Sequence, residues 1–261
     1  MFITRSTSRP EPATNPNDWS AHGLLLVGHG SDRSAGPNQQ LLAQADELRS
    51  RGLFGGVEAA VLYGEPTLVN ALQKLPALPV LTMPMFMCDG MFTKKIIPEQ
   101  ITLARSVSGY ASEISICTPV GLSEGLADLI AKQVLSKVTE YGQEKSEASI
   151  LLVGHGSTAS DASWQATERH AARLRRLETY REVRTAYLDQ HPLFGDVLSE
   201  LGGPVYVVGL FAAAGMHAGD DIPIKIEACS GAQNICYLGA IGSDPGMIDL
   251  ALDQINSLPV T

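Results

Sequence analysis

Two histidines of the chain stand in the same short sequence, which makes this sequence the first candidate for chemistry. His29 lies in GLLLVGHGS and His155 lies in SILLVGHGS, 126 positions further on. Each follows an apolar run and is flanked by glycines, which let the backbone turn sharply and let a ligand approach closely. A neutral imidazole accepts a proton near pH 7 or donates electrons to a metal ion. The repetition favours a functional histidine over a turn histidine satisfied by a local hydrogen bond.

A third histidine, His217, belongs to a second repeated block. The segment MPMFMCDGMFTKKIIP (residues 83–98) matches VGLFAAAGMHAGDDIP (residues 208–223) at an offset of 125 positions. Only the later block contains a histidine. His155 and His217, both in the second copy, suit a divalent metal such as Fe, Co, Ni or Zn, for which imidazole is a favoured ligand.

The two blocks repeat at nearly the same offset, so the chain consists of two copies of one unit. Within each copy, short apolar runs alternate with segments of helical periodicity. Regular alternation of strands and helices with short connections is typical of a parallel sheet covered by helices on both faces. The sequence therefore predicts an α/β protein with two similar doubly wound parallel-sheet domains and a cleft between them.

The expected elements place all three histidines at one kind of position. Strands are expected near residues 24–27, 57–63, 80–86, 114–118, 150–153, 183–188, 205–210 and 235–238. Helices are expected near residues 37–52, 67–75, after 98, 122–141, 162–177, 193–201, 220–229 and 245–255. His29, His155 and His217 then follow strands, and open α/β sheets bind ligands outside the carboxyl ends of their strands.

The domain organisation follows from the repeat and from two polar segments. Residues 1–21 are polar and contain three prolines, so we expect a disordered tail. Residues 22–141 form the expected N-terminal domain and residues 148–261 the expected C-terminal domain. The polar sequence GQEKSEA (residues 142–148) joins them.

The composition excludes several classes of protein. Of the 261 residues, 44% are apolar and 18% charged, which is typical of a globular chain. No apolar run approaches the ~18 residues that a membrane span needs. The net charge of −9 argues against a nucleic-acid binder, which needs a basic surface. We expect a cytoplasmic protein that binds neither nucleic acid nor membrane and is a monomer or a weak homodimer.

The repeated motifs resemble those of a known family. GHGS after the first strand of each copy, together with GMHAGDDIP in the second, is similar to the class II tetrapyrrole chelatases, from about Gly23 to the C-terminal helix. The resemblance implies an ATP-independent lyase that inserts Co²⁺ or Fe²⁺ into a sirohydrochlorin-type tetrapyrrole, in cobalamin or siroheme biosynthesis. The metal ion is then a substrate, and no cofactor is permanently bound. The absence of a P-loop motif agrees with insertion that needs no nucleotide.

The resemblance also assigns site residues, all in the second copy. His155 and His217 match the family's metal-site histidines and are the expected catalytic residues. Asp189 matches a carboxylate that some members add to the metal site. Asp221 matches an aspartate four residues after the second histidine, and either holds the ring of His217 or caps the helix that follows.

The first copy departs from the family pattern at two positions. Tyr63 stands where the second copy has Asp189, and Phe92 stands where it has His217. His29 therefore lacks both partners. We interpret the first copy as a degenerate, non-catalytic site.

Two lysines distinguish the copies by charge. Lys94 and Lys95 replace Gly219 and Asp220 of the second copy. They are expected either to pair with carboxylates of the tetrapyrrole or to form the solvated start of a helix.

Two other functions are compatible with parts of the pattern. A metal- or tetrapyrrole-binding carrier would keep the cleft without turnover. The joint retention of His155, Asp189, His217 and Asp221 argues against it, although Phe92 shows that site residues have been replaced in this chain. Phosphoryl transfer through a GHG histidine would need nearby arginines, and the second motif has none.

Overall fold

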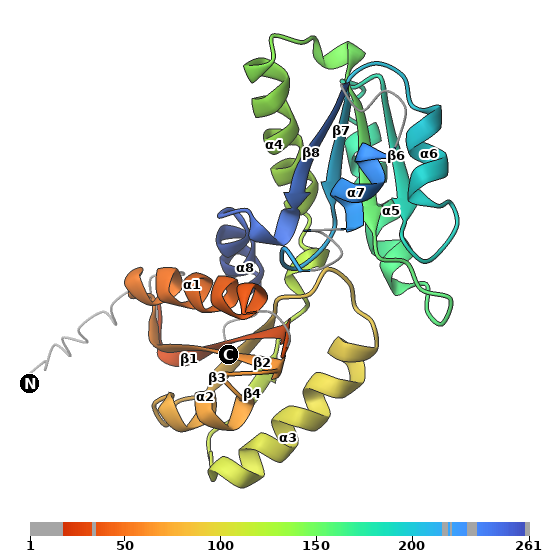
Figure 1. Ribbon diagram of the computed structural model, residues 1–261. Helices are drawn as coiled ribbons and strands as arrows, with labels where there is room; N and C mark the ends of the chain where they lie inside the picture. The colour runs from red at the N-terminus through yellow and green to blue at the C-terminus, as the bar shows by residue number, and fades with distance from the viewer. Residues whose placement is uncertain (1–17, 33–34, 216–218, 220, 229–233, 259–261) are drawn as a thin grey trace, which may run out of the picture.

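The computed structural model of the protein describes residues 18–32, 35–215, 219, 221–228 and 234–258. These residues form two four-stranded sheets, with the strand orders β2-β1-β3-β4 and β6-β5-β7-β8. Every pairing in both sheets is parallel. The sheets follow one another along the chain, with helices on their faces (Figure 1). The predicted α/β class with two parallel sheets is confirmed.

The strands coincide with the apolar runs of the sequence. The first sheet contains β1 (Trp19–Gly30), β2 (Phe54–Tyr63), β3 (Val80–Pro84) and β4 (Ile114–Ile116), and the second contains β5 (Ser149–Gly154), β6 (Glu182–Tyr187), β7 (Val205–Gly209) and β8 (Ile235–Ala240). β1 begins earlier than expected, at Trp19, whose side chain is 7% exposed. Residues 19–21, which the sequence assigns to the tail, therefore belong to the sheet.

The helices occupy the expected intervals. They are α1 (Gly36–Ser50), α2 (Leu68–Lys74), α3 (Ile97–Ser108), α4 (Leu126–Glu140), α5 (Ala162–Arg175), α6 (Phe194–Glu200), α7 (Ile222–Glu227) and α8 (Met247–Asn256). Short turns of tighter or wider helix are η1 (Phe92–Ile96), η2 (Val120–Leu122), η3 (Lys145–Glu147) and η6 (Ile241–Ser243). Within the described ranges, none of these helices has the length and apolar character needed to cross a membrane.

The central strands of each sheet are buried on both faces, which explains their unalternated apolar runs. In β1, Leu24 and Leu26 point into a central cluster with α1 and α8, whereas Leu25 and Val27 point into a separate cluster with α2 and α3. All four side chains are fully buried. β5 alternates in the same way between the central cluster and a cluster with α6 and α7. This is the doubly wound arrangement that the sequence predicts.

The last helix of each half packs against the other half (Figure 1). Helix α4 follows the first sheet but lies beside the second, where the Tyr180 hydroxyl donates to the Ala131 carbonyl at 3.2 Å. Helix α8 follows the second sheet but lies against the first, where Trp19 Nε1 donates to Asn256 Oδ1 at 2.9 Å. Residues 142–148 divide the chain into the two copies of the repeat. In the folded protein, the last helix of each copy packs on the other copy.

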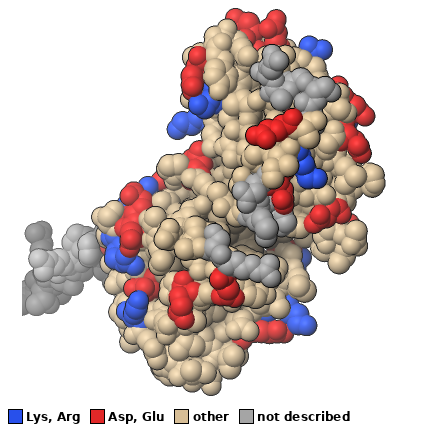
Figure 2. Space-filling view, in the orientation of Figure 1, with Lys and Arg blue, Asp and Glu red and all other residues tan. Residues whose placement is uncertain are grey.

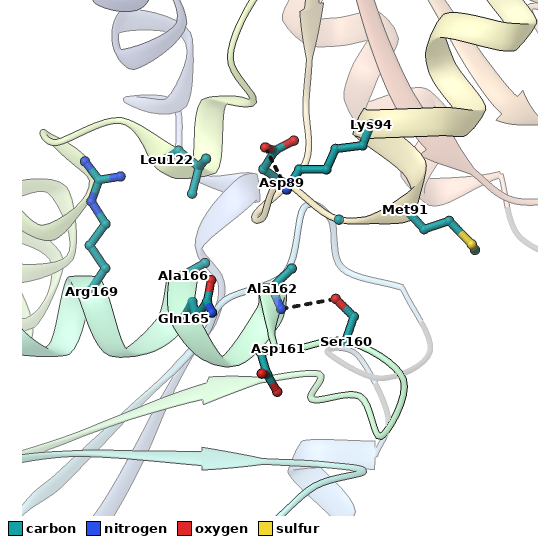
Figure 3. A pocket seen from close by; sticks show the side chains of 11 residues that line it. Asp89, Met91, Lys94, Leu122, Ser160, Asp161, Ala162, Gln165, Ala166 and Arg169 are labelled. Atoms are coloured by element: carbon teal, nitrogen blue, oxygen red, sulfur yellow. Dashed lines mark hydrogen bonds and ion pairs between the residues drawn. The ribbon is translucent and has the colours of Figure 1, made fainter.

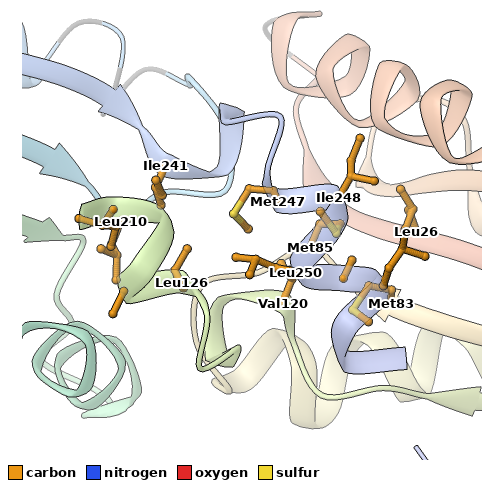
Figure 4. Packing of buried hydrophobic residues seen from close by; sticks show 14 of the residues in the cluster. Leu26, Met83, Met85, Val120, Leu126, Leu210, Ile241, Met247, Ile248 and Leu250 are labelled. Atoms are coloured by element: carbon orange, nitrogen blue, oxygen red, sulfur yellow. The ribbon is translucent and has the colours of Figure 1, made fainter. Parts of the chain in front are cut away.

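The exchanged helices join the two halves through a continuous apolar core. Figure 4 shows Ile248 of α8 beside Leu26 of the first sheet, and Met247 of α8 on the side toward the second half, where Leu210 belongs to the same cluster. Burial of large apolar side chains is the main favourable contribution to folding. The central apolar cluster, which contains residues of both sheets, therefore holds the two halves together.

Candidate functional site

The candidate site lies where the strand order of the second sheet reverses. The chain leaves β5 toward β6 on one side, whereas β7, on the other side of β5, leads to β8. In open α/β sheets, this reversal leaves a crevice outside the carboxyl ends of the two strands. His155 follows β5 directly, and residues 210–215 follow β7. The two segments leave the sheet together, because the Leu210 amide donates to the Val153 carbonyl at 2.7 Å.

Nδ1 of His155 faces two oxygen atoms. Its Nδ1 lies 3.1 Å from the Gly156 carbonyl oxygen and 3.2 Å from Asp189 Oδ2. A carbonyl oxygen only accepts hydrogen bonds, so Nδ1 carries a proton, and in the neutral imidazole Nε2 is then the nitrogen with the lone pair. Metal-binding histidines usually donate their second ring N–H to a carboxylate or a carbonyl in this way. With its side chain 46% exposed, His155 has the tautomer and the access of a metal ligand or a proton acceptor.

Asp189 reaches His155 because β6 ends beside β5. The amides of Leu188 and Asp189 both donate to the His155 carbonyl, at 3.2 and 3.1 Å. These bonds fix the backbone of the carboxylate relative to the imidazole. The structure therefore brings together two of the predicted site residues, which are 34 positions apart in the sequence.

Gly156 is required by the turn that presents His155. Its φ of +78° lies in the left-handed region, which side chains rarely adopt. A Cβ at this position would lie 2.8 Å from the Cβ of Gln190 and 2.9 Å from the Cβ of Tyr187. The second glycine of the GHG motif thus meets both a conformational and a packing requirement.

The other predicted ligand, His217, lies outside the described residues, as does Asp220. Asp221 is described, directly before α7, and its side chain makes no capping hydrogen bond to that helix. Among the described residues, no group of three His, Cys, Asp or Glu side chains could hold a metal ion. The described part of the chain supplies His155 and Asp189 of the predicted set.

The first half repeats the geometry without the carboxylate. His29 follows β1, and its Nδ1 lies 3.0 Å from the Gly30 carbonyl oxygen. β2 has the same register against β1 as β6 has against β5, which gives Tyr63 the position of Asp189. The His29 ring centroid lies 4.8 Å from that of Tyr63 and 4.8 Å from that of Phe92. Two aromatic rings thus surround the histidine that lacks its polar partners.

A cavity of about 630 Å³ opens between the halves (Figure 3). One wall comes from the segment after β3, with Asp89 and Lys94, whose ion pair spans 3.4 Å. The facing wall is formed by the residues just before α5, including Ser160, and by the first half of α5 as far as Arg169. Lys95 is exposed but is not among the residues that line this cavity. Of the two predicted lysines, Lys94 is therefore the one that faces the space between the halves.

Charged side chains of both signs lie on the surface and in the cavity. Figure 2 shows acidic and basic side chains interspersed over one face of the molecule. The chain has 28 acidic and 19 basic residues. The cavity is lined by two basic residues, Lys94 and Arg169, and by two acidic ones, Asp89 and Asp161. Arg169 lies 3.6 Å from Glu124, which also pairs with Arg173.

Sequence reasoning missed His170, which lies in a basic stretch of α5. Its side chain is fully buried, and its Nε2 donates to the Gly121 carbonyl of the first half at 2.7 Å. Burial lowers the pKa of this imidazole. Nδ1 has no hydrogen-bond partner among the described residues. The signal that would have revealed it is the repeat, since His170 stands at the position of Gln44, another polar residue buried on the corresponding helix.

Comparison with known proteins gives consistent matches along the chain. The CbiX family model matches residues 23–137 and again residues 149–258. The chain is 28% identical over 262 residues to a probable sirohydrochlorin cobaltochelatase of Halobacterium salinarum, covering 88% of this chain and 89% of that protein. It is 27% identical over 243 residues to the sirohydrochlorin ferrochelatase of Bacillus subtilis, covering 89% and 90%. The solved structure of CbiX, described as the terminal enzyme of siroheme biosynthesis in denitrifying bacteria, shares the fold with a TM-score of 0.74 at 24% identity, covering 91% of this chain and all of that one.

Proposed function

The chain belongs to the CbiX family, and on this premise we propose that it is a chelatase that inserts Co²⁺ or Fe²⁺ into a sirohydrochlorin-type tetrapyrrole. The two curated relatives are named for cobalt and for iron insertion into sirohydrochlorin. The observation that carries the proposal is the contact of His155 Nδ1 with Asp189 Oδ2 at the strand-order reversal. It gives the second half a histidine that is oriented through Nδ1 by a carboxylate, as metal-binding histidines usually are.

The reaction requires a base as well as a metal ligand. A tetrapyrrole loses its pyrrole N–H protons when it receives a divalent ion. His155 Nε2 accepts a proton or binds the incoming ion, and Asp189 stabilises the imidazolium that results. The Gly156 carbonyl keeps the ring in the same orientation throughout.

His217 is the second ligand of this proposal, and Asp221 is its supporting carboxylate. The segment after β7 leaves the sheet beside His155, at the reversal point. An imidazole pair with one carboxylate suits several first-row ions. The metal is a substrate here, so the site must release it to the macrocycle. Open coordination positions, as in catalytic metal sites, permit that transfer.

The residues proposed for the site all belong to one chain, so a monomer is sufficient for turnover. No nucleotide is needed, because the exchange of protons for metal drives the insertion. We place the reaction in the cytoplasm. The partners of the protein are its two substrates, the tetrapyrrole and the metal ion.

The test is insertion followed by visible absorption. Purified protein is mixed with sirohydrochlorin and excess Co²⁺ or Fe²⁺, and the spectral change is compared with a control without protein. A chelatase forms many product molecules per chain. A carrier, the alternative function, binds one equivalent without raising the rate of metallation. A rate equal to that of the control would refute the proposed activity.

A further inference from the structure

The first half carries a group of aromatic rings at the sheet edge where the second half carries its candidate ligands. We call His29, Tyr63, Phe86 and Phe92 the aromatic cluster. The ring of His29 lies between those of Tyr63 and Phe92, with centroids 4.8 Å from each. Phe92 stacks on Phe86 with centroids 5.9 Å apart and planes inclined by 26°. The two departures from the family pattern thus form one packed group.

Part of the aromatic cluster is exposed. Phe86 is 9% exposed and anchors the group, whereas Tyr63 is 44% exposed. Met91, next to Phe92 in the chain, is 63% exposed. Adjacent exposed apolar side chains with polar neighbours are typical of binding surfaces in soluble proteins. Phe86 and Phe92 pack on the core beneath α2 and α3, so Tyr63 and Met91 are the exposed part of this surface.

The aromatic cluster reaches the space between the halves through His29, and residues next to Phe92 in the chain line a second cavity there. His29 lines a cavity of about 170 Å³ whose other wall includes Gly215 of the second half. Met91 and Lys94 line the cavity of about 630 Å³ that faces α5 (Figure 3). Gly215 ends the described segment that leads to His217. His29 of the cluster therefore lies across a small cavity from Gly215 of the second half.

On the basis of the proposed function, we propose that the aromatic cluster binds the tetrapyrrole. Tyr63 and Phe92 contact the conjugated ring system, and Lys94 pairs with a carboxylate at its rim. Aromatic side chains gain energy from packing against other aromatic systems, beyond the area they bury. Lys94 is 65% exposed and only 3.4 Å from Asp89, an exposed ion pair of small worth, so a substrate carboxylate can recruit it.

The replacement of two ligands by two rings also has a chemical reason. A second set of metal ligands across the same space would compete with the first for the ion. Rings at Tyr63 and Phe92 remove that competition and supply apolar contact for the macrocycle instead. The first half then holds the tetrapyrrole while the second half supplies the metal and accepts the protons.

The test separates tetrapyrrole binding from metal binding. Metal-free sirohydrochlorin is titrated into wild type, Tyr63→Ala, Phe92→Ala, Tyr63→Phe and Tyr141→Ala, and the change in its visible spectrum gives the Kd. The Kd and the KM for sirohydrochlorin should rise about tenfold in Tyr63→Ala and Phe92→Ala. The kcat at saturating sirohydrochlorin and the Co²⁺ affinity should stay within about twofold of wild type, because those depend on the second half.

Two variants serve as controls. Tyr63→Phe keeps the ring and should bind like wild type. Tyr141, 53% exposed at the end of α4, is a matched tyrosine outside the cluster, so Tyr141→Ala should also bind like wild type. If Phe92→Ala unfolds, the exposed Tyr63→Ala still decides the result. Equal binding by Tyr63→Ala and Tyr141→Ala, in a protein whose wild type inserts metal, would overturn the inference alone. Failure of wild type to bind or metallate sirohydrochlorin would overturn the proposed function and the inference with it.

Discussion

His170 and Gln44 stand 126 positions apart, and each donates a hydrogen bond from one half of the protein to a glycine carbonyl of the other. His170 Nε2 donates to Gly121 at 2.7 Å, and Gln44 Nε2 donates to Gly242 at 3.1 Å. Gly121 lies in η2, which leads into α4, and Gly242 lies in η6, which leads into α8. The chain passes between the halves at these segments. Each passage is held by a buried side chain at the same position of the repeat.

The first prediction concerns the free energy of unfolding in acid. Burial lowers the pKa of His170, and Arg169 and Arg173 lower it further, against the opposing effect of the bond to Gly121. Glu124 faces the same helix and pairs with both arginines. The unfolded chain takes up a proton near pH 6.5, while the folded imidazole stays neutral. The free energy of unfolding should therefore fall as the pH drops below about 6.5, until folded His170 itself is protonated.

Substitution at the same position isolates this effect. His170→Gln copies the residue of the first half and should flatten the loss of stability between about pH 7 and pH 5. His170→Ala leaves the Gly121 carbonyl without its donor and should cost about 1–3 kcal/mol at neutral pH. Denaturant unfolding at several pH values measures both. An equal acid loss in wild type and His170→Gln would assign the effect to other groups.

The second prediction concerns the pair at the sheet edge. Asp189→Asn keeps the shape of the side chain but removes the charge that stabilises the imidazolium, so kcat for metal insertion should fall roughly 10- to 100-fold. His155→Ala should abolish insertion and leave the fold intact. Asp196→Asn on α6 and His22→Ala near the start of β1 are matched controls and should keep the wild-type rate. A wild-type rate in His155→Ala would remove this histidine from the chemistry.

The third prediction concerns the turn after His155. Gly156 and Gly109 both have positive φ, +78° and +71°, but a Cβ at Gly109 meets no described atom within 4 Å. Gly109→Ala should cost only the left-handed conformation, roughly 1–2 kcal/mol. Gly156→Ala adds the crowding against Gln190 and should displace His155, so it should lose more stability and most of the insertion rate. Thermal unfolding and the insertion assay compare the two. Equal behaviour would show that crowding at Gly156 has no consequence.

The fourth prediction reverses the divergence of the two halves. Tyr63→Asp together with Phe92→His places a carboxylate and an imidazole beside His29, in the register of the second half. The double variant should bind two Co²⁺ per chain where wild type binds one, as measured by titration calorimetry or by the Co²⁺ absorption bands. Phe92→His alone should bind the second ion weakly. A folded double variant that still binds one ion would mean that the halves differ in more than these two residues.

Much of the site could be predicted from the sequence because of the repeat. Alignment of the two copies shows that Tyr63 corresponds to Asp189. Neighbouring parallel strands bring the residues at their carboxyl ends together, and the contact of His155 with Asp189 is an example. Which lysine faces the cavity could not be predicted, because it depends on the wide turn η1 that precedes α3. The exchange of α4 and α8 could not be predicted either. An apolar helix stripe predicts that a face is buried, but not which of two similar sheets covers it.

The helix exchange makes the chain equivalent to a domain-swapped dimer whose two copies have been tethered. Because α4 already lies on the second half, residues 142–148 connect two elements of that half. The Arg181 amide holds the end of this tether through the Ala148 carbonyl at 2.9 Å. A cut in the tether would leave two interlocked fragments, each with its last helix embedded in the other. Tethering also allows the two copies to differ in sequence. A symmetric pair must change both of its sites at once, whereas a tethered pair can keep histidines on one side of the cleft and acquire aromatic rings on the other.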